Sequence, residues 1–118
     1  MALSTQFDPL FQKYGGTVPV AYLRALAFRE SGLNPNANAG KAAAQGLLQI
    51  VTVARDGYNQ RHGTAYTTTQ TLDPAVNVQI AADLLQSIIR AYAKHPDRNL
   101  HEDWSNPEFV KLLGRLHR

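Results

Sequence analysis

The segment from Asp73 to Tyr92 places the strongest constraint on what this chain can fold into. An aspartate followed by a proline is a typical helix start, because the carboxylate caps free backbone N–H groups and the proline ring fixes φ near its helical value. The apolar residues that follow recur at helical spacing over several turns: Val76, Ile80, Leu84, Leu85, Ile88, Ile89 and Tyr92. The pattern predicts one long amphipathic helix, the longest in the chain.

The remaining segments also predict helices. A short helix is expected over residues 8–14, a second that begins near Pro19, and a last amphipathic one after Asn106 and Pro107. No stretch alternates convincingly with period two, and there is no internal repeat. We therefore expect a mainly α fold.

The length of 118 residues suits a single domain with a modest core, so residues 1–118 are treated as one unit. The 44% hydrophobic and 18% charged residues are typical of a globular protein. The absence of cysteine excludes disulfides, thiolate metal sites and thiol nucleophiles. The formal charge of +3 weakly favours anionic polymers such as nucleic acid or cell-wall glycan.

Glu30 stands at the end of an apolar run. It falls at helical spacing on the same stripe as Val20, Leu23, Leu26 and Ala27, so we expect it to face inward. A carboxyl group that loses hydration holds its proton more readily, which suits a general acid. The alternative, which the pattern alone favours, is a helix-end carboxylate paired with Arg24 or Arg29.

The residues after Glu30 are small and polar. The segment GLNPNANAGKAAAQG, residues 32–46, leaves room for a groove, and its backbone amides and asparagines offer hydrogen bonds. Gln49 would add a directed amide contact, unless it is only an exposed residue near a helix turn. Residues 57–71 are polar and irregular, which predicts a surface excursion that could line the same groove.

Three blocks of the sequence, in this order, resemble a known family: "ALAFRESGLNP", "QGLLQI" and "LDPAVNVQIAADLLQSIIRAY". Their order and spacing are similar to those of the catalytic domain of soluble lytic transglycosylases and their goose-type lysozyme relatives. The similarity covers about residues 8–92. It implies a lysozyme-like helical domain with a substrate groove.

The resemblance also implies roles for single residues. Glu30 matches the catalytic acid, and Ser31 matches the hydroxyl beside it and is expected to bind the substrate. The other residues expected to bind the substrate, along the groove, are Gly46, Leu47, Gln49 and Ile50. Asn77 falls on an asparagine of the later helix whose role in the family is mostly structural. Leu48 stands where methionine is usual, a nearly volume-conserving change.

The activity that the resemblance implies is that of an enzyme, a peptidoglycan lytic transglycosylase. It would cleave the β-1,4 bond between MurNAc and GlcNAc and leave a 1,6-anhydromuramyl product. Glu30 alone would serve as acid and then as base, helped by the substrate's own N-acetyl group. No cofactor and no metal is expected, because the histidines are scattered without metal-ligand spacing.

Two other functions stay open. The final segment, NPEFVKLLGRLHR, lacks the Tyr-Asn-Ala-Gly type of motif whose tyrosine helps to hold the family's catalytic glutamate. We therefore expect either a truncated chain or a missing part that is supplied differently, and a non-catalytic peptidoglycan-binding or assembly module is one alternative. A hydrolytic lysozyme that uses Asp56 or another acid to activate water is the second.

The expected partners are peptidoglycan glycan strands, with secretion-system or phage-particle proteins as further candidates and no nucleic acid. The N-terminal residues lack the basic start and apolar core of a secretory signal, and no apolar run reaches membrane-spanning length. We expect the protein in the cell envelope or periplasm, or in a phage particle.

Overall fold

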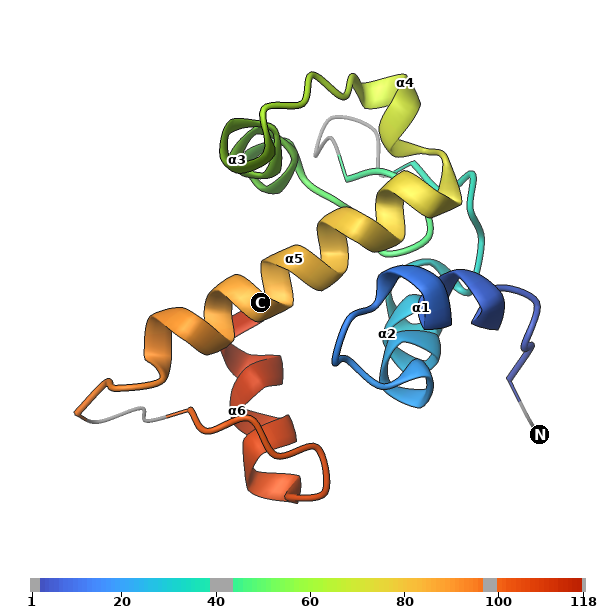
Figure 1. Cartoon of the computed structure of the whole chain (residues 1–118). Coiled ribbons are helices and arrows are strands. Elements are labelled where there is room, and N and C mark those ends of the chain that lie inside the picture. The colour runs from blue at the N-terminus through green and yellow to red at the C-terminus, as the bar shows by residue number, and fades with distance from the viewer. Residues whose placement is uncertain (1–2, 39–43, 97–99, 118) are drawn as a thin grey trace. The chain divides into compact units, whose positions relative to one another are not determined.

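The computed structural model describes residues 3–38, 44–96 and 100–117. Within these residues the chain forms helices and no strand, which confirms the mainly α prediction (Figure 1). The helices are α1 (Asp8–Tyr14), α2 (Val20–Ser31), α3 (Thr52–His62), α4 (Thr68–Thr71), α5 (Pro74–Tyr92) and α6 (Pro107–His117). None of the helices in this part of the chain is long and apolar enough to span a membrane.

The chain divides into two compact units, Met1–Ala82 and Asp83–Arg118. The first contains α1 to α4 and the first half of α5. The second contains the rest of α5 and α6. The prediction of a single domain stays a prediction, and the two units are described separately.

The core of the first unit is built on α2. This helix follows Pro19, whose ψ of 144° is extended, and it ends at Gly32, whose φ of 66° is left-handed. Its stripe buries Leu23, Leu26 and Ala27 as predicted, whereas Val20 at the start of the stripe is only half-buried. Complete burial of a leucine side chain contributes about 1.5–3 kcal/mol, so these positions fix one face of α2 toward the interior.

The segment expected to be irregular is partly a helix. Residues 57–62 belong to α3 and residues 68–71 form α4, so those parts of the prediction for residues 57–71 were wrong. Tyr58 is the buried residue of α3, and its ring stacks on that of His62 one turn later, with 4.2 Å between ring centroids. Because α3 buries a single side chain, its sequence has no apolar stripe with a helical period. The helix was not predicted for that reason. Gly63, with φ of 64°, ends the helix.

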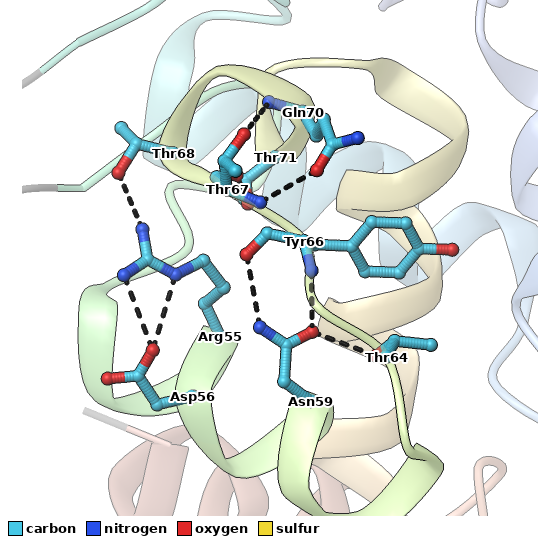
Figure 2. A network of polar contacts seen from close by, with 9 residues as sticks. All are labelled: Arg55, Asp56, Asn59, Thr64, Tyr66, Thr67, Thr68, Gln70 and Thr71. Carbon is cyan, nitrogen blue, oxygen red and sulfur yellow. Dashed lines mark hydrogen bonds and ion pairs between the residues drawn. The ribbon is translucent and has the colours of Figure 1, made fainter.

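The connection between α3 and α4 is held by hydrogen bonds from side chains to the backbone (Figure 2). Asn59 donates from Nδ2 to the carbonyl of Tyr66 at 3.0 Å, and its Oδ1 accepts the Tyr66 N–H at 3.0 Å and the Thr64 hydroxyl at 2.8 Å. Thr67 and Gln70 then form a capping box at the start of α4. The connection is therefore an ordered element with its own polar network.

The predicted starts of α5 and α6 are confirmed. Asp73 Oδ1 accepts the N–H of Ala75 at 2.8 Å, and Asn106 Oδ1 accepts that of Glu108 at 3.0 Å. Within the stripe predicted for α5, the buried residues are Ile80, Leu85 and Ile89. Since each start depends on an adjacent capping side chain, local sequence was enough to locate it.

Helices α1 and α2 are joined by an ion pair. Arg24 donates from Nε to Asp8 Oδ1 at 3.0 Å, and a second hydrogen bond joins its Nη2 to Oδ2. The hydrogen bond from Arg24 lowers the pKa of Asp8 below its ordinary value of 3.8, although desolvation partly opposes the shift. The ionised carboxylate is thus the form that the fold favours.

This pair predicts a pH-dependent contribution to stability. Because the pKa of Asp8 is lower in the folded than in the unfolded state, the contribution is present above the unfolded value and is lost as pH falls through the folded one. We expect Asp8→Asn to lower the melting temperature at neutral pH, with the difference from the unaltered chain shrinking on acidification. Thermal unfolding followed by circular dichroism across this range measures it. A difference that grows at acid pH would contradict the assignment.

Candidate active site

Glu30 lies in the last turn of α2 and is at the surface. Its side chain is 31% exposed, so the prediction that it continues the buried stripe is wrong. The last turn of the helix, residues 28–31, contains no buried side chain. Ala27 is the last buried residue of α2. Helical spacing identifies the face on which a residue lies but not how far along the helix the packing extends. The carboxyl group is consequently accessible to a substrate.

Among the described residues, Arg29 is a charged neighbour of Glu30. Its Nη2 lies 3.8 Å from Glu30 Oε1, which is too long for a hydrogen bond, and both side chains are partly exposed. Such surface pairs contribute little, about 0–1 kcal/mol. Arg24, the other partner considered from the sequence, is engaged by Asp8. Neither of these two arginines therefore holds the Glu30 carboxylate strongly.

The block QGLLQI forms a tight turn. Gln45 and Ile50 exchange both backbone hydrogen bonds, at 3.0 and 2.9 Å, and so close the loop between them. Gly46 and Gln49 have left-handed φ values of 78° and 51°. The backbone N–H of Gly46 also donates to the carbonyl of Ala37 at 2.7 Å. This segment, residues 45–50, is called the QGLLQI turn below.

Most side chains of the QGLLQI turn are buried. Leu47 is 0% and Ile50 3% exposed, so these two predicted groove residues offer a glycan almost no surface in this structure. Gln49 is only half-buried. Its Nε2 donates to the carbonyls of Gly46 at 2.9 Å and Ala37 at 3.3 Å, which uses both protons. The side-chain carbonyl oxygen of Gln49, which is an acceptor, is the group that remains to bind a ligand.

Ser31 connects the end of α2 to the QGLLQI turn. Its hydroxyl lies 2.7 Å from the carbonyl oxygen of Leu47 and 3.1 Å from that of Ala27, and it accepts the backbone N–H of Asn34 at 3.1 Å. The helix turn that carries Glu30 is therefore fastened to the turn that carries Gln49. The part of the predicted loop in residues 39–43 lies outside the described residues.

Asn77, in the first turns of α5, holds the QGLLQI turn from another helix. Its side chain is fully buried, its Oδ1 accepts the N–H of Leu48 at 2.7 Å, and its Nδ2 donates to the carbonyls of Gln45 and Thr71, both at 2.8 Å. This agrees with the structural role that the family resemblance implies. Thr71, whose carbonyl binds Asn77, was not identified from the sequence. The capping-box spacing from Thr67 to Gln70 could have located the short helix α4, which ends at Thr71.

Asp56, the candidate for a second catalytic acid, lies on the surface of α3. Its side chain is 64% exposed, and its Oδ1 accepts from the guanidinium of Arg55, which also donates to Thr68 at 2.6 Å (Figure 2). In the described ranges no group of three histidine or acidic side chains is placed to hold a metal ion.

A shallow pocket lies in the second unit, between the residues before α6 and the start of that helix. Its lining residues are Leu100, His101, Asn106, Glu108, Phe109 and Leu112. None of the residues predicted for the site lines this pocket. The groove beside Glu30 thus stays a prediction that the pocket does not test.

The fit of Gly46 against Asn77 yields a stability prediction. A Cβ at Gly46 would lie 2.5 Å from Asn77 Nδ2, whereas a Cβ at Gly63, which has a similar φ of 64°, would meet no described atom within 4 Å. We expect Gly63→Ala to cost about 1 kcal/mol for left-handed strain, and Gly46→Ala about 2 kcal/mol more because of the clash. Urea unfolding of both variants measures the difference. Equal costs would show that the contact with Asn77 is not tight.

Comparison with known proteins identifies the family of this chain. The sequence profile described as Transglycosylase SLT domain matches residues 10–104, which include Glu30, the QGLLQI turn and Asn77. No significant match was found among curated proteins or among solved structures. Since the profile spans most of the chain and its helical architecture agrees, the chain belongs to the family of transglycosylase SLT domains, whose activity is directed at peptidoglycan.

Proposed function

We propose that this protein is a peptidoglycan lytic transglycosylase in which Glu30 acts first as acid and then as base. The observation that carries the proposal is the attachment of α2 to the QGLLQI turn. The accessible carboxyl group of Glu30 stands on a helix end whose next residue, Ser31, is hydrogen-bonded to Leu47 of that turn. The two matched family blocks are therefore adjacent in space, as a shared site requires.

The proposed reaction needs one carboxyl group and no water. Protonated Glu30 donates to the glycosidic oxygen as the bond from MurNAc C1 to that oxygen breaks, and the departing GlcNAc keeps the proton. The substrate's N-acetyl group stabilises the positive charge that develops on the sugar. The Glu30 carboxylate then removes the proton of the C6 hydroxyl of the same MurNAc, whose oxygen bonds to C1 and closes the 1,6-anhydro ring. An intramolecular attacker benefits from a high effective concentration.

Gln49 is proposed to orient the glycan. Because its two amide protons are donated to the carbonyls of Gly46 and Ala37, it offers a carbonyl oxygen that suits a sugar hydroxyl or an acetamido N–H. Its left-handed backbone, with φ of 51°, is a local strain of the kind found at binding sites.

The place of action that fits this substrate is the cell envelope or a phage particle. The charge of +3 suits anionic wall polymers.

Exchange of Glu30 tests the assignment of the acid. Glu30→Gln is nearly isosteric but cannot cycle a proton, so we expect release of anhydromuropeptides from purified sacculi to fall by roughly 10²-fold or more. Asp56→Asn is the matched control, since it neutralises another exposed carboxylate beside an arginine, and it should retain activity. Circular dichroism confirms folding of both variants. Undiminished release by Glu30→Gln would end the proposal.

The products distinguish the proposed function from its two alternatives. Because no water enters the reaction, digestion in heavy-oxygen water should give anhydro-ended, unlabelled muropeptides by mass spectrometry. Labelled reducing ends would identify a hydrolytic lysozyme instead. Binding of the unaltered chain to sacculi without any release would identify a non-catalytic module.

A further inference from the structure

The peptide unit between Leu47 and Leu48 is held at both of its polar ends by side chains from two helices. Its carbonyl oxygen lies 2.7 Å from the hydroxyl of Ser31 on α2, and its N–H donates to Asn77 Oδ1 on α5 at 2.7 Å. Both leucines are buried, at 0% and 3% exposure, so water does not compete well for these groups. One peptide plane thus joins two segments that are distant in sequence.

Asn77 has only one orientation available to it. Its Nδ2 protons are both donated, to the carbonyls of Gln45 and Thr71, and turning the amide over would set its NH2 group against the N–H of Leu48. Gly46 leaves no room for movement on one side, because even a Cβ there would lie 2.5 Å from Nδ2. The acceptor offered to Leu48 is therefore fixed in place.

Ser31 has a single hydroxyl proton, and its shortest contact is the one to Leu47. The distance of 2.7 Å to Leu47 O, against 3.1 Å to Ala27 O, favours donation to the QGLLQI turn. The hydroxyl also accepts from the backbone N–H of Asn34, in the loop after α2. Its bonding is thus directed mainly at the protein's own backbone.

A peptide unit that accepts at its oxygen and donates at its nitrogen is polarised by both bonds, so each strengthens the other. We infer that Ser31 and Asn77 are positioning residues that act as a pair, through the Leu47–Leu48 peptide unit, to fix the helix turn that presents Glu30. The catalytic consequence rests on the proposed function. This role differs from the substrate contact that the family resemblance assigns to Ser31.

The arrangement in which Ser31 and Asn77 hold the Leu47–Leu48 peptide unit from both ends is called the clamp. It is tested by amide hydrogen exchange of Ser31→Ala. Loss of the hydroxyl leaves Asn77 in place, yet we expect the Leu48 N–H to exchange roughly tenfold faster or more, because its bond is weakened through the peptide unit. The N–H of Tyr66, which Asn59 holds in the same unit of the chain, is the internal reference and should change much less. Equal acceleration of both amides would overturn the inference, since it would mean only a general loss of stability.

Positioning is tested by the kinetics of the same variant on a soluble glycan oligomer. We expect Ser31→Ala to lower kcat by roughly 10- to 100-fold with KM within about twofold, because a misplaced acid slows the chemical step more than binding. Ser31→Thr keeps the hydroxyl and should restore most of the loss. Asn59→Ala removes a comparable backbone-binding amide that shares no partner with Ser31, and its kcat should match that of the unaltered chain.

The outcomes separate the two proposals. A raised KM with unchanged kcat in Ser31→Ala would make Ser31 a substrate ligand and overturn the positioning role. Absence of turnover by the unaltered chain would overturn the proposed function alone. The clamp would then be decided by the exchange of the Leu48 amide.

Discussion

The buried amide of Asn77 is the interaction on which the candidate site depends. Backbone groups that are removed from water need partners, and an unpaired one costs about 1–3 kcal/mol. The QGLLQI turn is neither helix nor strand, so its N–H and carbonyl groups are not all paired by a regular ladder. Asn77 supplies two of these bonds, to the N–H of Leu48 and the carbonyl of Gln45, from a single side chain that is 0% exposed. An irregular segment can therefore lie buried beside α2 without leaving these groups unpaired.

The same arrangement explains how an accessible acid can be held in a fixed position. Burial anchors α2 through residues such as Leu23, and the pair of Arg24 with Asp8 joins it to α1, but neither acts on the last turn. That turn is secured instead by Ser31, which reaches the peptide unit that Asn77 holds from its other end. Glu30 thus stays in contact with solvent while the backbone of the residue next to it is constrained. A catalytic acid needs both properties.

How much could be predicted from the sequence depended on how local the cause was. The helix starts at Asp73 and Asn106 were predicted because each cap lies within two residues of the N–H that it satisfies. The three blocks that resemble the family also predicted the family membership that the profile match shows. The exposure of Glu30 was not predictable, since a helical period does not reveal where packing ends. The length of α3 was missed because its only buried residue is Tyr58.

The contacts of the QGLLQI turn were beyond sequence reasoning for a related reason. Its left-handed Gln49 and its hydrogen bonds to Asn77 depend on residues about thirty positions apart that meet only in the folded chain. A pattern could assign Asn77 a structural role but could not name the three groups that it binds. Long-range polar pairing of this kind leaves no periodic signal.

The most direct measurement is a titration of the Glu30→Gln variant with a soluble peptidoglycan oligomer, followed by amide chemical shifts. The account predicts that the largest changes fall on the last turn of α2 and on Gln49, with little change at Phe109 in the pocket of the second unit. Changes confined to that pocket, with none at the end of α2, would contradict it.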